Sequence, residues 1–309
     1  MQKQKISIEL IGGIGNQLFC YFAGLCISDK TSSRVKFIHN ALPKNHPQFN
    51  SQISDLNLPT DIKASTFNFF SATMIIKIFD SISFRVPLIK KLKNKGIYMD
   101  QRVGVLNECR EIQHKIDKRI FKKSVVLKGH YQDISYYSEY MKNNKIMAIY
   151  PKNPSDEYRQ LIDSKLLENL TIVHIRRGDF EHFRSEIGVL STEYYRLAIN
   201  ELLELEKQIE IVVVSDEPEK AKIIFPKSFS FIPISYTKNF NLKNPAELLI
   251  AMSYAKNLII SNSTFSLWSA ILSRSTKNIV YPQPFNLNIP LKVSGFPSTW
   301  IPLPAIFEK

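Results

Sequence analysis

The stretch that decides the fold is LTIVHIRRGD, residues 170–179. The apolar run before its histidine contains β-branched side chains, which is typical of a central strand in a parallel sheet. Two arginines follow where this strand should end, and open α/β folds bind ligands at the carboxyl ends of such strands. Adjacent guanidiniums repel each other unless an anion lies close to both, and a diphosphate accepts their paired N–H groups well. Arg176 and Arg177 therefore indicate a diphosphate site. The alternative is a pair of surface arginines in ion pairs with Asp179 and Glu181.

The sequence after residue 170 alternates regularly between strand and helix patterns. The expected strands are 170–175, 210–214, 229–234, 258–260 and 278–281. The expected helices are 192–206, 218–225, 245–256 and 265–273. Strands and helices that alternate at these lengths indicate βαβ units and a parallel sheet. This half of the chain is therefore predicted to be a nucleotide-binding, Rossmann-like domain.

The first half of the chain begins with the same pattern and then becomes irregular. It starts with a strand at 6–11, a glycine turn at 12–15 and a helix at 16–28, with further strands at 34–38 and 125–127. A helix to about residue 142 should follow GHYQ at 129–132, whereas residues 40–120 allow no assignment. The segment 150–155 contains two prolines and is predicted to be a linker. We therefore expect an N-terminal domain at 1–150 and a C-terminal domain at 151–309.

Composition narrows the class of protein. The chain has 309 residues, 44% hydrophobic and 22% charged, as in soluble globular proteins. Its formal net charge of +13 suggests an anionic partner, although no dense basic run resembles a nucleic-acid-binding arm. The cysteines Cys20, Cys26 and Cys109 are odd in number and lack C-x-x-C spacing, which argues against disulfides or a zinc site and favours a reducing cytosol. No stretch is typical of a signal peptide or a membrane span.

Three further motifs could carry chemistry. GGIGNQ at 12–17 joins a strand to a helix and could bring backbone N–H groups to an anion, or could simply be a tight turn. SDEP at 215–218 could bind a ribose or base, but we favour the role of helix cap. SNSTFSLW at 261–268 offers more hydroxyls than one helix cap needs, which suits a phosphate or a sugar. No Asp-x-Asp pair occurs, so a metal-bridged diphosphate site is not expected.

Together these motifs resemble glycosyltransferase family 11, the bacterial-type α-1,2-fucosyltransferases. The resemblance runs from residue 8 to about 273 and includes GGIGNQLF at 12–19, GHYQ at 129–132, HIRRGD at 174–179, VVVSDE at 212–217 and SNSTFSLW at 261–268. Three positions depart from the family pattern, namely His130, Glu217 and Leu267.

The resemblance implies an α/β, GT-B-like fold with two facing Rossmann-like domains and a donor cleft between them. Residues 1–150 would form the acceptor-side domain and residues 151–309 the GDP-sugar-binding domain. The implied reaction moves L-fucose from GDP-β-L-fucose to the 2-hydroxyl of a galactoside, with inversion, in bacterial surface-glycan (O-antigen-type) synthesis. It requires no metal and no cofactor beyond the donor substrate.

The resemblance also implies roles for individual residues. The expected donor-binding residues are Gly13, Gly15, Asn16, Gln17, His174, Arg176, Arg177, Asn262, Ser263, Thr264 and Phe265. Inversion needs a base for the acceptor hydroxyl or a late proton transfer. The candidates for that base are Asp179, Glu181 and His182, with Glu186 as a further alternative. Positive charges favour an ionised carboxylate, so Asp179 beside two arginines would be a poor base and could instead orient one of them.

Two other classes of protein remain open. A basic RNA-binding or scaffold protein would explain the charge, and a non-catalytic nucleotide-sugar sensor would explain the arginines. We expect a cytoplasmic chain that acts on a galactose-containing, possibly lipid-linked glycan without binding nucleic acid. We also expect peripheral contact with the inner face of an anionic membrane through Lys90, Lys91, Lys93 and Lys95.

Overall fold

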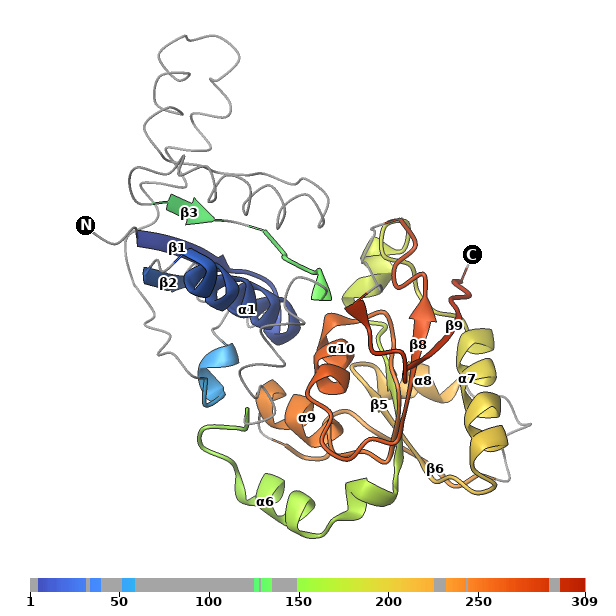
Figure 1. Ribbon diagram of the computed structural model, residues 1–309. Helices are drawn as coiled ribbons and strands as arrows, with labels where there is room; N and C mark the ends of the chain where they lie inside the picture. The colour runs from blue at the N-terminus through green and yellow to red at the C-terminus, as the bar shows by residue number, and fades with distance from the viewer. Residues whose placement is uncertain are drawn as a thin grey trace. The chain divides into compact units, whose positions relative to one another are not determined.

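The computed structural model describes nine stretches of the chain (Figure 1), namely residues 5–31, 34–39, 52–58, 125–127, 129–134, 149–224, 232–242, 244–288 and 295–308. The contacts divide the chain into two compact units. One comprises Met1–Ser54 with Leu58–Gln132, and the other comprises Asp55–Asn57 with Asp133–Lys309. The boundary expected after residue 150 falls inside the second unit, where Leu56 forms an antiparallel bridge with Pro151. The lysines expected at a membrane, Cys109, the helix expected after GHYQ and nearly all of 40–120 lie outside the described residues.

The first unit contains a parallel sheet of three strands in the order β2-β1-β3. These strands are β1 (Lys5–Leu10), β2 (Arg34–His39) and β3 (Val125–Leu127). Helix α1 (Ile14–Thr31) follows β1 through the glycine turn, as expected. The helix lies close against β2, because a Cβ added at Gly24 would be 2.6 Å from the Phe37 ring. Cys20 and Cys26 are buried in α1, which confirms that they are small core residues.

The second unit contains a six-stranded parallel sheet in the order β6-β5-β4-β7-β8-β9. The strands are β4 (Thr171–Ile175), β5 (Ile211–Ser215), β6 (Ile234–Thr237), β7 (Asn257–Ile259), β8 (Asn278–Gln283) and β9 (Ile301–Pro304). The helices are α6 (Asp156–Asp163), α7 (Thr192–Leu205), α8 (Pro218–Lys222), α9 (Pro245–Met252) and α10 (Thr264–Ile271). β4 lies at the centre and is buried along its whole length. The βαβ alternation expected from the sequence is confirmed.

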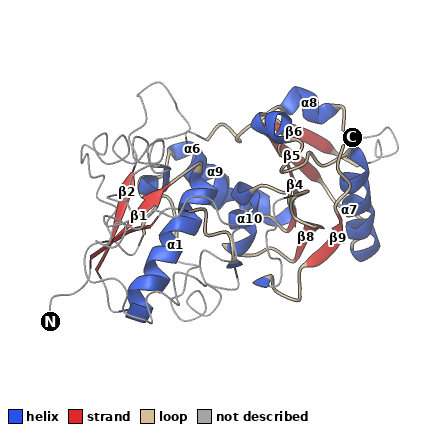
Figure 2. Ribbon diagram, turned by 90° about the horizontal axis from the view of Figure 1, so that it is seen from above, coloured by secondary structure: helices blue, strands red, loops and turns tan. Residues whose placement is uncertain are grey.

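Helices cover both faces of this sheet (Figure 2). Alternate residues of the strands, including Val173, Ile175 and Val213, pack with α7 and α8 in one apolar core. His174 faces the other side, because its ring stacks on Phe265 of α10. Among the described residues, no helix is long and apolar enough to cross a membrane.

Three elements of the second unit differ from the sequence-based expectation. Strand β6 begins at Ile234, where the expected strand ends. Helix α6 was not expected; it begins after Ser155, whose hydroxyl accepts a hydrogen bond from Tyr158 N at 3.2 Å. Strand β9 was not expected either, because Pro302 and Pro304 break a strand pattern. It pairs only with β8 among the described strands, and such an edge position tolerates residues without an N–H group.

Candidate functional site

Arg176 follows β4 and is oriented by two carboxylates. Its Nε and Nη2 donate to Asp179 Oδ1 at 3.0 and 2.7 Å. Its Nη1 lies 3.2 Å from Asp216 Oδ2, and its guanidinium lies 5.7 Å from the centre of the Phe180 ring. The side chain is 29% exposed. The structure therefore places a fixed and accessible guanidinium at the carboxyl edge of the sheet.

Asp216 joins the ends of two neighbouring strands. It follows β5, and its Oδ1 accepts a hydrogen bond from the backbone N–H of Arg177 at 3.0 Å. Its Oδ2 would lie 2.3 Å from a Cβ at Gly178, so a larger residue there would require this carboxylate to shift. The capping role predicted for SDEP is wrong: α8 has no side-chain cap, and Ser215 Oγ accepts only from Glu217 N within this turn. In the sequence, the feature that pointed to Asp216 was its position just after the predicted strand at 210–214, which forms β5 beside β4.

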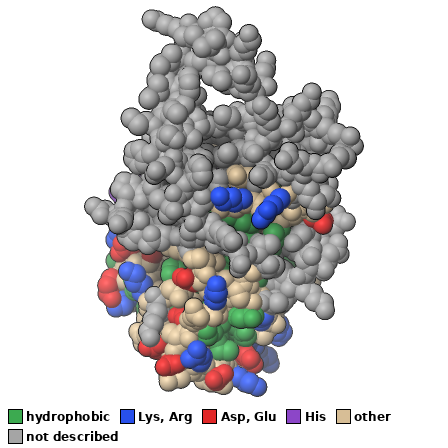
Figure 3. Space-filling model, turned by 90° about the vertical axis from the view of Figure 1, so that its left-hand side faces the viewer, with side chains coloured by type: hydrophobic (Ala, Val, Ile, Leu, Met, Phe, Trp, Pro, Cys, Tyr) green, Lys and Arg blue, Asp and Glu red, His purple; other side chains and the backbone are tan. Residues whose placement is uncertain are grey.

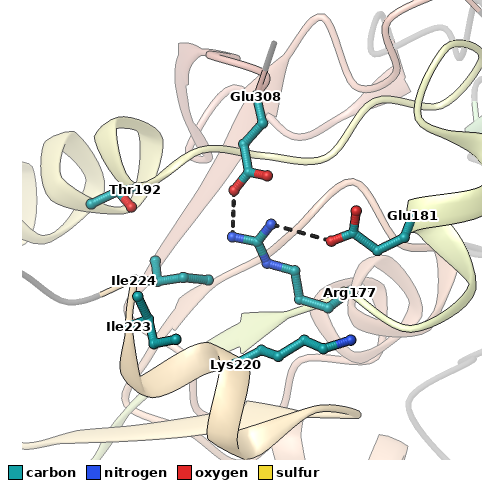
Figure 4. A pocket seen from close by; sticks show the side chains of 7 residues that line it. All are labelled: Arg177, Glu181, Thr192, Lys220, Ile223, Ile224 and Glu308. Atoms are coloured by element: carbon teal, nitrogen blue, oxygen red, sulfur yellow. Dashed lines mark ion pairs between the residues drawn. The ribbon is translucent and has the colours of Figure 1, made fainter.

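Arg177 contacts a different set of carboxylates from Arg176. Its Nη2 lies 2.5 Å from Glu308 Oε1, and its Nη1 lies 3.6 Å from Glu181 Oε1 (Figure 4). Its side chain is only 9% exposed. It lines an open hollow of about 220 Å³ together with Glu181, Thr192, Lys220, Ile223, Ile224 and Glu308. The ion pairs proposed as the alternative to a diphosphate site are thus present, namely Arg176 with Asp179 and Arg177 with Glu181. Arg177 is nevertheless buried and is not a surface arginine.

His174 is a neutral group beside the arginine pair. Its Nδ1 lies 2.8 Å from Ser261 Oγ, and its ring stacks on Phe265 at 5.7 Å with an angle of 26° between the planes. Burial, together with the positive charge of Arg176, lowers the pKa of His174 to about 3. His174 is therefore a buried ring that carries no positive charge at neutral pH.

The hydroxyl-rich segment before α10 makes mainly structural contacts. Asn262 Nδ2 donates to the carbonyl oxygens of Ile187 and Gly188 at 3.1 and 3.0 Å. Ser263 is the N-cap of α10, and its hydroxyl accepts from Phe265 N at 3.3 Å. Thr264 is the first residue of the helix and is half-buried. Asn262 therefore holds the loop before α7, a contact that its motif did not reveal.

The glycine turn of the first unit is held by side-chain amides. Gly12 has φ +69°, and the Asn16 amide lies so close above it that a Cβ would meet Nδ2 at 2.6 Å. Gln17 Nε2 donates to Gly12 O at 2.8 Å, and Gln17 Oε1 accepts from Ile53 N at 3.3 Å.

Two more glutamines complete this arrangement: Gln132 of the GHYQ segment, and Gln52, which the sequence motifs did not include. Gln52 Oε1 accepts from Ile14 N at 2.8 Å, and Gln132 Nε2 donates to Asn16 Oδ1 at 2.8 Å. Gly13 is exposed and Gly15 is buried within the same turn. Of the expected donor-binding residues of this motif, Asn16 and Gln17 therefore fix the turn to two other segments of the first unit.

Three of the four candidate bases lie on one short 3-10 turn, Asp179–Phe183, and the fourth, Glu186, is an exposed residue that follows it. Asp179 is paired with Arg176, as described above. The hydrogen bond from Arg184 holds the pKa of Glu181 below its ordinary value, and burial opposes this shift only in part. His182 is exposed. Both carboxylates of this turn are thus engaged by arginines, which favours a positioning role over that of a base.

Residues 155–300 match the family model described as "Glycosyl transferase family 11". This segment contains the arginine pair, Asp216 and the segment before α10. The resemblance that the motifs indicated is therefore confirmed for this part of the chain.

Two curated proteins of Escherichia coli are similar to the chain over most of its length. The O-antigen biosynthesis glycosyltransferase WbnK is 24% identical over 293 residues, which cover 88% of this chain and 91% of that protein. An alpha-1,2-colitosyltransferase is 28% identical over 283 residues, which cover 90% of this chain and 91% of that protein.

Solved structures show the same fold. The fucosyltransferase NodZ from Bradyrhizobium matches with a TM-score of 0.51 and 12% identity, over 88% of this chain and 94% of that chain. NodZ alpha-1,6-fucosyltransferase co-crystallized with GDP matches with a TM-score of 0.51, 12% identity and coverages of 88% and 93%. At this identity the likeness concerns the fold alone. It confirms the expected class, an α/β chain of the GT-B type with parallel sheets.

Proposed function

We propose that this chain, whose residues 155–300 match glycosyl transferase family 11, is a fucosyltransferase of bacterial O-antigen-type glycan synthesis. It would move L-fucose from GDP-β-L-fucose to the 2-hydroxyl of a galactoside, with inversion and without a metal. The acceptor would be a galactose-containing glycan, either free or lipid-linked, and the enzyme would work in the cytoplasm or at the inner face of the membrane.

One observation carries the donor assignment. Arg176 lies at the carboxyl end of the central strand, held from two sides by Asp179 and Asp216 and still partly exposed. A guanidinium has five N–H donors in a rigid plane, so it can bind a phosphate while its remaining donors stay paired. A guanidinium that is already oriented loses little side-chain entropy when a diphosphate binds. The neutral His174 on the same strand would offer a hydrogen bond beside it.

The remaining expected residues receive narrower roles in this proposal. Arg177, Asn262 and Ser263 support the donor site through the contacts described above rather than by gripping the diphosphate. Thr264 and Phe265, at the start of α10 beside His174, are the residues of that segment that we expect nearest the donor. The exposed His182 remains the candidate base, and a late proton transfer would need none.

A second donor is favoured by one specific finding. The relative that is 28% identical is named for transfer of colitose, which is fucose without its 3-hydroxyl. The same GDP-binding groups would serve both donors, so the choice would depend on contacts to the 3-position of the sugar.

Transfer by the purified chain tests both donors directly. GDP-fucose and its 3-deoxy analogue are offered separately with a panel of glycans that end in galactose, and GDP release and product are measured. We expect fucose to be transferred and NMR of the product to show an α-1,2 linkage. Transfer of the 3-deoxy sugar alone would change the donor assignment, and no transfer of either sugar despite GDP binding would favour a nucleotide-sugar sensor.

A further inference from the structure

Two arginines and two glutamates form a ring of alternating charges that includes Arg177. Arg177 contacts Glu308 at 2.5 Å and Glu181 at 3.6 Å (Figure 4). Arg184 Nη2 lies 2.5 Å from Glu181 Oε2 and 3.2 Å from Glu308 Oε2. Each arginine contacts both glutamates, so the ring is closed and its formal charges cancel. Three of its members belong to the segment 177–184, and only Glu308 comes from elsewhere in the chain.

Backbone pairing brings Glu308 to this place. Its N–H donates to Val189 O at 2.8 Å, and Ser191 N donates to Ile306 O at 2.8 Å. Phe307 forms an antiparallel bridge with Leu190 between these two bonds. Residues 306–308, which follow β9, are thus aligned with the segment that leads into α7.

Gly188 shows how close this packing is. It has φ +81°, and a Cβ there would lie 2.4 Å from Phe307 Cδ1. Asn262, in the segment before α10, donates a hydrogen bond to Gly188 O. The loop between β4 and α7 is therefore fixed at its far end by Phe307 and Asn262, and in its middle by the charge ring.

The ring is linked to the proposed phosphate contact through Asp216. The Arg177 N–H donates to Asp216 Oδ1, and Asp216 Oδ2 contacts Arg176. Without Glu308, the buried guanidinium of Arg177 would keep only the longer of the two contacts described here. A buried charge that loses a partner is strongly unfavourable, so the loop would rearrange to find a new one.

We infer that Glu308 is a positioning residue of the donor site, which fixes the loop at 176–188 and thereby the orientation of Arg176 toward a nucleoside diphosphate. The inference rests on the proposed function for the identity of that ligand. It assigns Glu308 no contact with the donor. Its effect should therefore appear in donor binding and in the order of the loop, and not in acceptor binding.

The test compares Glu308→Gln with the full-length wild type. Glu219→Gln is the matched control, because Glu219 is an exposed glutamate of α8 that pairs with Lys222 at 2.7 Å outside the ring. GDP binding is measured by calorimetry, and KM is measured for donor and acceptor. We expect Glu308→Gln to weaken GDP binding and raise the donor KM about tenfold, the scale of one charge-assisted hydrogen bond. The acceptor KM should stay unchanged, Glu308→Asp should recover part of the loss, and Glu219→Gln should match the wild type.

Hydrogen exchange supplies a readout that needs no ligand. Backbone amides of 176–188 should exchange faster in Glu308→Gln than in either the wild type or Glu219→Gln. If Glu308→Gln does not fold, Arg184→Gln removes the more exposed arginine of the ring and should give the same pattern.

Unchanged GDP affinity in a folded Glu308→Gln chain would overturn the inference while leaving the proposed function intact. If that chain were also less stable than the wild type, the role of Glu308 would be merely structural. Failure of the wild type itself to bind GDP would overturn the proposed function and the inference together, and the wild-type measurement alone reveals it.

Discussion

Arg176 meets one carboxylate on each side of its guanidinium and is still partly exposed. We expect Arg176→Ala to weaken GDP binding about tenfold to a hundredfold, because a hydrogen bond to a charged group contributes about 1.5–3 kcal/mol. Arg176→Lys should restore little, because an ammonium cannot replace the planar fork. Calorimetric titration with GDP measures both effects.

Arg159→Ala is a matched control, since Arg159 is an exposed arginine of α6 paired only with Asp156 among the contacts described. Full GDP affinity in a folded Arg176→Ala chain would exclude the role.

His174 should make stability depend on pH. Its pKa is about 3 in the folded chain, where burial is the main cause, against an ordinary value of 6.5. Between these values the unfolded chain binds the proton and the folded chain does not, so stability is lost as the pH falls below 6.5. At pH 5.5, one unit below 6.5, this loss amounts to about 1 kcal/mol.

The variant His174→Asn isolates this contribution, because it removes the titration and keeps a polar group near Ser261. Urea unfolding of both proteins at pH 7.5 and 5.5 is the measurement. The stability advantage of the wild type over the variant should shrink by about 1 kcal/mol between these pH values. An advantage that stays constant with pH would show that His174 is not buried as a neutral ring.

The loops after β4 and β5 contact each other through Asp216, which accepts a hydrogen bond from Arg177 N and lies against Gly178. Gly178→Ala should push the Asp216 carboxylate away, because the new methyl group would lie 2.3 Å from Oδ2. We expect a loss of about 1–3 kcal/mol in unfolding free energy, as for other overpacked sites, and weaker GDP binding through Arg176. Gly13→Ala is the stability control, since its Cβ would have its nearest neighbour at 4.0 Å. Equal stability of the two variants would contradict this account.

The sequence predicted the elements whose residues follow a clear period. β4 and β5 are short apolar runs with β-branched residues. The helices α8 and α9, which follow β5 and β6, begin at the recognisable residues Pro218 and Pro245. The strand β9 was not predicted, because two of its four residues are prolines. Ser191 is the N-cap residue of α7, although its hydroxyl makes no cap hydrogen bond.

The candidate site was predictable in its residue types but not in its pairings. The sequence identified Arg176 and Arg177 together, and only the fold shows that they contact different carboxylates. Glu308 follows a strand that the pattern did not reveal, so no local rule could bring it to Arg177. Asn262 has the residue type of a sugar or phosphate contact, yet its amide is directed to two backbone carbonyls. Long-range partners of this kind depend on strand order, which single-sequence patterns do not contain.

The chain carries a formal net charge of +13, which suggests an anionic partner. On the face shown in Figure 3, the described acidic and basic side chains are interspersed rather than gathered into one patch. The cluster Lys90, Lys91, Lys93 and Lys95 lies outside the described residues. We predict weak, salt-sensitive binding of the chain to anionic vesicles through this cluster, at roughly 1 kcal/mol per basic residue near the surface.

Sedimentation with anionic and neutral vesicles at low and high salt measures this binding. Replacing the four clustered lysines by serine should abolish it. The control replaces four exposed lysines of the second unit by serine, namely Lys152, Lys165, Lys207 and Lys238. Equal loss in both variants would show that net charge, and not the cluster, attracts the membrane; equal partitioning to both vesicle types would refute an electrostatic contact.

Transfer should proceed without a divalent cation. A diphosphate leaving group gains negative charge in the transition state, and that charge must be stabilised by a metal or by fixed positive groups. The sequence contains no Asp-x-Asp pair for a bridging metal, whereas Arg176 is already oriented at the sheet edge. We therefore expect the same kcat with excess EDTA and with added magnesium or manganese, measured as GDP release.

If EDTA abolishes turnover and magnesium restores it, the arginine alone does not stabilise the leaving group. If Arg176→Ala also gains activity on addition of magnesium while the wild type does not, the metal is only replacing the lost guanidinium, and the metal-free mechanism stands.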